Sequence, residues 1–288
     1  MQTNAETEQQ INGGSAEGFL RLAMFEYQKV DRCSSHRLGL LKQSPAHLRF
    51  HIDNPSPTTD AMRFGSAVHC YILEPGEFKK EFVVAPKCDK RTTVGKETWA
   101  AFQLENPGKT YLTADDMQRI SGIAEAIQGN FTARALIESV EDAEICGFWT
   151  DRTTGVKCKM RIDARLNRVG ALLDLKTTSD ASRREFERSI FRFGYHRQAA
   201  MYLDGNAALG CKYDDYTFIA VESEAPFALA VYRLSDEVIE LGRKENAALM
   251  HLYAICETDD EWLGYPDMIQ DISIPAWAKR QIEEDNAL

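Results

Sequence analysis

Closely spaced cysteines are missing from this sequence. The 288 residues include seven cysteines, at positions 33, 70, 88, 146, 158, 211 and 256. No two of them form the Cys-x-x-Cys pair that brings two thiolates to one metal ion. Their odd number and wide spacing indicate reduced thiols and argue against a disulfide framework.

Long hydrophobic runs are missing as well. About 18 uninterrupted apolar residues are needed to cross a membrane, and no segment of the sequence is that long. The first residues contain neither the basic stretch nor the apolar stretch of a secretory signal. We therefore expect a cytoplasmic protein that makes no contact with membranes.

Positive charge is also in short supply. The sequence has 34 Lys and Arg against 44 Asp and Glu, a net charge of -10, which argues against a protein that coats nucleic acid by charge alone. Two segments nevertheless gather cations, and each is either a binding surface or ordinary solvated charge. The basic loop contains Lys87, Lys90, Arg91 and Lys96. The arginine-rich segment contains Arg183, Arg184, Arg188, Arg192 and Arg197.

Hydrophobic residues make up 44% of the chain, enough for a sizeable core. Residues 1–18 have Ile11 as their only large aliphatic side chain, which indicates a disordered lead-in. No repeat or linker divides the rest, so we expect a single domain at 19–288. Its core is expected at about 60–235, followed by a C-terminal helical extension at 236–288.

Hydrophobic periodicity gives the expected order of elements. Helices are predicted at 37–50, 60–73, 113–128, 195–209 and 236–256. Strands are predicted at 144–150, 156–166, 171–177, 216–221 and 227–234. The central part therefore reads as a helix, three meandering strands, a second helix and two further strands.

The strand predicted at 156–166 alternates without a break up to Asp163. Its apolar residues are Val156, Cys158, Met160 and Ile162. Side chains two residues apart lie on one face of a strand, so these four residues face the core and Asp163 faces the other way. On the next strand, Asp174 and Lys176 share a face for the same reason.

The register of this hairpin decides whether the two aspartates meet. An even loop centred on Arg168 and Val169 pairs residues whose numbers add up to 337, which places Asp163 opposite Asp174. Opposed side chains have Cβ atoms about 5 Å apart. Two carboxylates at that separation repel each other unless a cation lies between them, which favours a metal site. A surface charge ladder is the alternative that the spacing leaves open.

These residues resemble the PD-(D/E)xK nucleases, in which an Asp on one strand is followed by Asp or Glu, any residue and Lys on the next. Asp163 and Asp174-Leu175-Lys176 match that pattern, with Ile162 where the family name has Pro. Gly65-x-x-x-His69 is similar to a helix of the RecB and RecE branch. The resemblance implies an α/β (α+β) fold with a restriction-endonuclease-like core: a central mixed β-sheet flanked by helices, with helical additions.

The resemblance also implies roles for individual residues. His69, Asp163, Asp174 and the Leu175 carbonyl would bind two Mg²⁺ or Mn²⁺ ions, and Lys176 would assist the attacking water. Gln198 and Tyr202 would contact DNA or the water from the following helix. Glu144 is the candidate for a further acidic ligand, with Glu141 and Asp142 as competitors. An iron-sulfur cluster is not expected, because only Cys211 and Cys256 follow this site.

A RecE-like member of this family would be bacterial or phage-encoded. It would degrade linear double-stranded DNA from the 5′ end, release 5′-mononucleotides and leave 3′ overhangs for a RecT-like annealing protein. Such exonucleases work as rings, so a tetramer or trimer is expected, with the arginine-rich segment contacting DNA. The alternatives are an endonuclease or helicase-associated nuclease of the same fold, an inactive DNA-binding module, and an α/β protein with an unrelated metal site.

Overall fold

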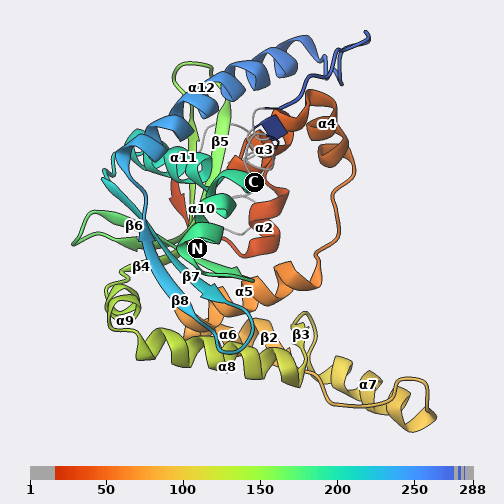
Figure 1. Cartoon of the computed structure of the whole chain (residues 1–288). Helices are drawn as coiled ribbons and strands as arrows, with labels where there is room; N and C mark the ends of the chain where they lie inside the picture. The colour runs from red at the N-terminus through yellow and green to blue at the C-terminus, as the bar shows by residue number, and fades with distance from the viewer. Residues whose placement is uncertain (1–16, 276–277, 280–281, 283–288) are drawn as a thin grey trace.

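The computed structural model describes residues 17–275, 278–279 and 282, and its centre is a six-stranded sheet (Figure 1). The strands follow the order β1-β4-β5-β6-β7-β8. They are β1 (Gly18–Leu20), β4 (Asp142–Thr150), β5 (Lys157–Leu166), β6 (Ala171–Thr178), β7 (Asp215–Glu222) and β8 (Leu229–Arg233). Only β6 and β7 run parallel, so the sheet is mixed.

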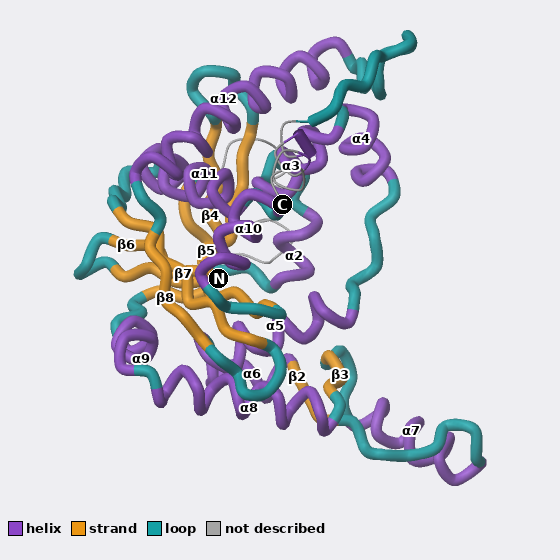
Figure 2. The backbone as a smooth tube through the Cα atoms, in the orientation of Figure 1, coloured by secondary structure: helices purple, strands orange, loops and turns teal. Residues whose placement is uncertain are grey.

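Helices cover both faces of the sheet (Figure 2). One face packs against α3 (Ser35–Gln43), α4 (Pro45–Asp53), α10 (Arg183–Arg192), α11 (Tyr195–Ala208) and α12 (Asp236–Asp259). The other packs against α5 (Asp60–Leu73), α6 (Pro75–Glu81), α8 (Ala114–Gly129) and α9 (Phe131–Glu138). A short helix, α2 (Met24–Lys29), follows β1. The expected fold class, a mixed sheet flanked by helices, is confirmed.

A small unit projects from the second face. The strands β2 (Phe82–Val84) and β3 (Thr110–Leu112) form a two-stranded parallel sheet, and the chain between them carries α7 (Thr93–Glu105). In Figure 1, α7 extends away from the body of the molecule at the lower right. No helix in the described residues is both long enough and apolar enough to span a membrane.

Two sequence-based expectations about the first 60 residues need correction. The helix predicted at 37–50 is two helices, because Pro45 has no backbone N–H and begins α4 after Ser44, which caps that helix by accepting from His47 N. Residues 1–16 of the predicted lead-in lie outside the described residues. Gly18, the last residue of that lead-in, begins β1 and pairs with Phe148.

The predicted hairpin register is confirmed. Ala164 pairs with Leu173, and Leu166 pairs with Ala171, so the residue numbers of each pair add up to 337 as expected. The ladder ends at Ala164. The preceding residue on β5 is Asp163, and its side chain takes the place of the next backbone partner. The backbone N–H of Leu175 donates to Oδ2 of Asp163 at 3.0 Å.

The regular alternation of β5 breaks at Asp163. Ile162 is buried in the core on the α11 side of the sheet, whereas Ala164, two residues further, is buried on the α5 side. On the neighbouring strand, Glu144 adopts a φ of 53°, which is unusual for a residue other than glycine. Both strands thus depart from regular β geometry at the same row, as strands often do at functional sites.

Candidate metal centre

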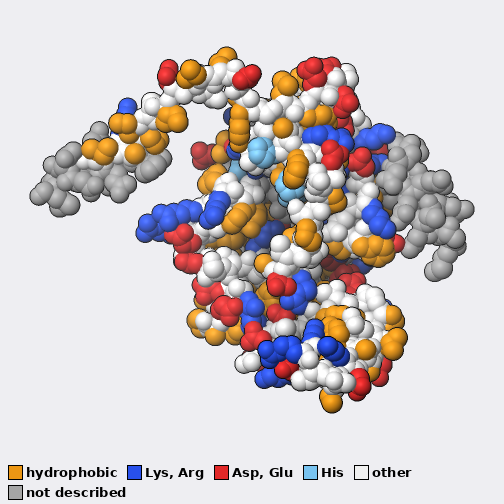
Figure 3. Space-filling model, turned by 90° about the vertical axis from the view of Figure 1, so that its right-hand side faces the viewer, with side chains coloured by type: hydrophobic (Ala, Val, Ile, Leu, Met, Phe, Trp, Pro, Cys, Tyr) orange, Lys and Arg blue, Asp and Glu red, His pale blue; other side chains and the backbone are white. Residues whose placement is uncertain are grey.

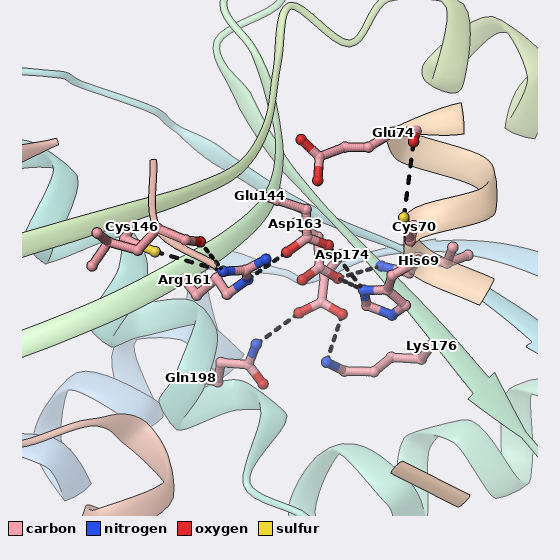
Figure 4. A network of polar contacts seen from close by, with 12 residues as sticks. His69, Cys70, Glu74, Glu144, Cys146, Arg161, Asp163, Asp174, Lys176 and Gln198 are labelled. Atoms are coloured by element: carbon pink, nitrogen blue, oxygen red, sulfur yellow. Dashed lines mark hydrogen bonds and ion pairs between the residues drawn. The ribbon is translucent and has the colours of Figure 1, made fainter. Parts of the chain in front are cut away.

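Three potential metal ligands converge from three elements. His69 comes from α5, Glu144 from β4 and Asp163 from β5, and one donor atom of each lies within 4.8 Å of the other two (Figure 4). Nδ1 of His69 is 3.5 Å from Oε1 of Glu144 and 3.5 Å from Oδ2 of Asp163. One imidazole nitrogen and two carboxylate oxygens fit a divalent cation such as Mn²⁺ or Mg²⁺.

The helix α5 delivers His69 to this point because its apolar stripe packs on the sheet. Thr59 caps its first turn by accepting from Met62 N, and Phe64, Ala67, Val68 and Cys70 are buried. Gly65 lies on the same helix, one turn before His69. A Cβ at Gly65 would lie 3.9 Å from Oγ1 of Thr177, an ordinary contact distance, so the approach of α5 to β6 does not require a glycine.

Asp174 lies beside this group rather than within it. It is only 1% exposed, and its Oδ1 is 2.6 Å from Nζ of Lys176. Its Oδ2 accepts hydrogen bonds from Nε2 of Gln198 and from the hydroxyl of Tyr216, both at 2.8 Å. The carboxylate is therefore fixed from three directions on the opposite side of Asp163 from Glu144.

Arg161 holds Glu144 in place. Its Nε donates to Oε2 of Glu144 at 2.6 Å, and its Nη1 donates to the carbonyl of Leu22 at 2.8 Å. Burial opposes ionisation of Glu144, but the contact with His69 and the charge of Arg161 outweigh it, so the pKa of Glu144 lies below its ordinary value. One carboxylate oxygen is thus bound to a guanidinium, and the other faces His69 and Asp163.

The charges of this site perturb its own proton affinities. Burial raises the pKa of Asp163 to about 7. Burial alone would lower the pKa of His69, but the charges of Asp163 and Glu144 raise it to about 9. A proton held by His69 or Asp163 partly neutralises the negative charge of this site. A metal ion that binds there would have to displace this proton.

Lys176 carries a positive charge next to Asp174 and Asp163. Burial would lower the pKa of Lys176, but the negative charges of Asp174 and Asp163 outweigh it and raise that pKa above the ordinary value. The ammonium group therefore stays protonated near neutral pH. It also lies over the ring of Tyr195, with Nζ 4.8 Å from the ring centroid.

The other residues predicted for the site differ in their burial and in their contacts. Tyr202 is 7% exposed. Burial raises the pKa of Tyr202 most, and the nearby negative charge of Asp163 raises it further. Glu141 and Asp142 stay outside the group, since Glu141 accepts from Arg168 N and Asp142 pairs with Arg165. Glu144 is therefore the acid that the fold brings to His69 and Asp163.

The arginine-rich segment divides into two parts. Arg183, Arg184, Arg188 and Arg192 are exposed on α10, together with Glu187 and Phe191. Arg197 departs from the expectation of a DNA-contacting residue. It is only 7% exposed, with Nε 3.5 Å from Oε2 of Glu245 on α12, because its position on α11 faces that helix.

Sequence reasoning missed Arg161 and Tyr216. Arg161 stands two residues before Asp163 in an alternating strand, so it reads as an ordinary polar side chain there. Tyr216 contacts Asp174 only because β6 and β7 pair in parallel, with Leu172 opposite Tyr216. Neither contact leaves a local signal in the sequence.

A protein-family model matches most of this chain. The family model described as "PDDEXK-like domain of unknown function (DUF3799)" matches residues 26–272. A search among curated protein sequences finds no match.

Two solved structures are among the matches, and the first of them is similar in fold. A candidate exonuclease from Eubacterium rectale has a TM-score of 0.58 and 11% sequence identity, covering 89% of this chain and 97% of that one. A phage-related exonuclease from Haemophilus somnus has a TM-score of 0.35 and 13% identity, covering 80% and 96%. The first likeness, at 11% identity, speaks for the fold alone and does not single out the RecE group.

The family match spans most of the chain and names the nuclease superfamily that the Asp163 and Asp174-Leu175-Lys176 pattern resembles. The chain therefore belongs to the PDDEXK-like DUF3799 family.

Proposed function

We propose that this protein is a divalent-metal-dependent exodeoxyribonuclease that degrades linear double-stranded DNA from the 5′ end. It would release 5′-mononucleotides and leave 3′ overhangs for a RecT-like annealing protein. The main support is the row of acidic side chains across three neighbouring strands, Glu144, Asp163 and Asp174, with His69 above it and Lys176 beside it. The polarity and the products rest on the resemblance to the RecE group.

The residues of the row would hold the cations. His69, Glu144 and Asp163 offer three donors to one ion, and Asp174 with the Leu175 carbonyl would complete the shell for a second. Bound Mg²⁺ or Mn²⁺ would lower the pKa of a water and neutralise the charge that develops on the phosphoryl group. The hydrogen bond from Leu175 N fixes Oδ2 of Asp163, so this carboxylate is oriented before any ion arrives.

Lys176 and Gln198 act on the reacting groups. The protonated ammonium of Lys176 would orient the attacking water and stabilise the additional negative charge of the transition state. Gln198 donates through Nε2 to Asp174, which leaves its amide oxygen to accept from the same water. Tyr216 donates to Oδ2 of Asp174, and the buried Tyr202 lies near Asp163, so both would keep bulk water from these carboxylates.

Contacts with DNA beyond the site would come from α10. This helix begins five residues after β6 ends, and its exposed arginines, Arg183, Arg184, Arg188 and Arg192, suit phosphate groups. Because the whole chain carries a charge of -10, a tetrameric or trimeric ring that turns these arginines inward would reconcile the acidic exterior with DNA binding. The native mass in solution tests the ring, and a monomer would contradict it.

End-labelled DNA tests the proposed reaction. Linear duplexes labelled at the 5′ or the 3′ end and a closed circular duplex are incubated with the protein and Mg²⁺ or Mn²⁺. Release of labelled mononucleotides from 5′ ends, with intact circles, is the expected result. Cleavage of circles would instead make the protein an endonuclease of the same fold. No cleavage of any substrate, together with retained DNA binding, would favour an inactive binding module.

A further inference from the structure

We propose that the projecting unit between β2 and β3 is a docking arm that grips duplex DNA several base pairs away from the bond being cut. The arm comprises residues 85–109: the basic loop, α7 and the turn that leads to β3. This proposal rests on the proposed function, because it assigns a contact surface for the same DNA substrate. Its partner is the phosphate backbone of double-stranded DNA.

The arm carries five cations against three carboxylates, and its positive charge is concentrated in the basic loop on an otherwise acidic chain. Between residues 85 and 96 there are four cations and a single carboxylate, Asp89. The four, Lys87, Lys90, Arg91 and Lys96, are all exposed. The side chain of Arg91 is 91% exposed even though it pairs with Asp89 at 3.0 Å. A local excess of cations on a chain with a charge of -10 fits a polyanion better than it fits another acidic surface.

The basic loop is folded tightly against α7. Thr92 caps the helix by accepting from Gly95 N, and its hydroxyl donates to the carbonyl of Asp89 at 3.0 Å. The packing is close enough that a Cβ at Gly95 would lie 1.9 Å from that same carbonyl oxygen. The ammonium of Lys90 is held over the ring of Trp99, 3.1 Å from its centroid. Lys90 and Arg91 are thus held by Trp99 and Asp89, which lowers the entropy cost of binding through these two cations.

Aromatic packing makes the arm rigid. Trp99 and Phe102 on α7 pack against Tyr111 on β3, with ring centroids 5.2 to 5.5 Å apart. At its base, Phe82 and Leu112 are buried in the core that also holds α5. The arm is therefore part of the folded domain and not a loose loop.

The strand β3, at the base of the arm, is joined directly to the helix that carries His69. Nη1 of Arg63 on α5 donates to the carbonyl of Tyr111 at 2.5 Å. Arg63 precedes His69 by six residues, which is about 9 Å along the helix axis. Duplex DNA is straight over this scale, since its persistence length is about 50 nm. A duplex with one end at the candidate metal centre would therefore run straight past the arm rather than bend away from it.

The surface view is consistent with this placement. In Figure 3 the lower lobe, where α7 points toward the viewer, carries a group of Lys and Arg side chains, and the surface above it is hollowed. The apolar side chains of Val94 and Leu104 are also exposed on the arm, at 72% and 83%. They offer an alternative use of the arm, as a contact between protein chains, which the experiment below separates.

The test compares two charge reversals of equal size in the full chain. The arm variant is Lys87→Glu with Lys96→Glu, and the control is Lys212→Glu with Lys244→Glu, two exposed lysines far from the arm in sequence and in the fold. Binding to a fluorescent duplex of about 30 base pairs, about 100 Å long, is measured by anisotropy with Ca²⁺ at several salt concentrations. Hydrolysis of bis(p-nitrophenyl) phosphate, which is too small to reach the arm, is measured with Mn²⁺.

We expect the arm variant to bind the duplex about tenfold more weakly than the control, and its salt dependence to fall by about one ion for each phosphate that it no longer neutralises. Its hydrolysis of the small diester should equal that of the control. Equal duplex binding by the two variants would overturn the proposal, and so would a change of native mass confined to the arm variant. If the wild type cleaves neither substrate, the proposed function fails, while the binding comparison still decides on the arm.

Discussion

The side chain of Glu144 depends on a neighbour that sequence reasoning did not identify. Glu144 lies at a φ of 53° and gives one carboxylate oxygen to Arg161, so its other oxygen is directed at His69 and Asp163. Groups that orient metal ligands in this way commonly contribute about 10- to 100-fold to metal affinity. We regard Arg161 as a positioning residue, because it acts through Glu144.

Replacing Arg161 should therefore weaken metal binding. We expect Arg161→Gln to raise the half-saturating Mn²⁺ concentration about tenfold, and Arg161→Lys to restore part of the loss. The matched control is Arg165→Gln, on the same strand, whose guanidinium pairs with Asp142 outside the site. Calorimetric titration with Mn²⁺ measures the affinity without any nuclease assay. Unchanged or tighter binding by Arg161→Gln would contradict this role.

Metal binding should also depend on pH, because protons and cations compete for the same ligands. His69, with a pKa raised to about 9, holds a proton at neutral pH in the metal-free site. Raising the pH from 6 to 9 removes that proton from an increasing fraction of the molecules, about half of them at pH 9, so Mn²⁺ affinity should increase, by at most about tenfold per pH unit for each proton displaced. Titrations in two buffers of different ionisation enthalpy would detect the released proton. A pH-independent affinity would show that His69 is not a ligand.

At the residue scale, spacing predicted part of the site. The interval between Asp163 and Asp174 was enough to derive a hairpin register that the structure confirms. The environment of each residue was not predictable. Arg161 looks like a solvent-facing strand residue, and Tyr216 reaches Asp174 from 42 positions further along the chain, through a parallel strand pairing that periodicity does not report.

Among the elements, helices with clear caps were the easiest to predict. The helix predicted at 60–73 has the bounds of α5, and Thr59 and Thr113 cap α5 and α8. The short elements were missed. The strands β1, β2 and β3 have three residues each, too few to show a period, and they exist because of what they pair with. The helix of the projecting arm was missed although α7 has 13 residues, because Gly95 is the one residue buried along it.

The packing of α11 against α12 gives a prediction at this scale. A Cβ at Gly242 on α12 would lie 2.3 Å from the backbone carbonyl oxygen of His196 on α11, and backbone cannot rotate away as a side chain can. We expect Gly242→Ala to lower the free energy of unfolding by about 1–3 kcal/mol, the usual cost of overpacking. Urea denaturation measures the change.

A second glycine provides the control. Gly129, at the end of α8, is exposed, and a Cβ there would meet nothing within 4 Å. Gly129→Ala should raise the free energy of unfolding by up to about 1 kcal/mol, because alanine is the better helix former. If both substitutions changed the free energy of unfolding in the same direction, close packing of α11 on α12 would not explain the effect of Gly242→Ala.

At the scale of the whole molecule, the net charge does not show how the charged residues are distributed. A charge of -10 argues against nonspecific coating of nucleic acid. Cations nevertheless lie together on α10 and on the arm, while Glu144 and Asp163 converge with His69 at the candidate metal centre. Sequence composition cannot reveal this separation, because it arises from the positions of α5, α7 and α10 around one sheet.

The central claim is that the row of carboxylates and Lys176 hydrolyses phosphodiester bonds with a divalent metal. The most direct measurement is the rate of nucleotide release from linear duplex DNA with Mn²⁺, with and without EDTA, for the wild type, Lys176→Ala and the control Lys212→Ala. We predict metal-dependent release by the wild type and the control, and a rate lower by about 10²-fold or more for Lys176→Ala. Release that persists in EDTA, or an unchanged rate for Lys176→Ala, would contradict the account.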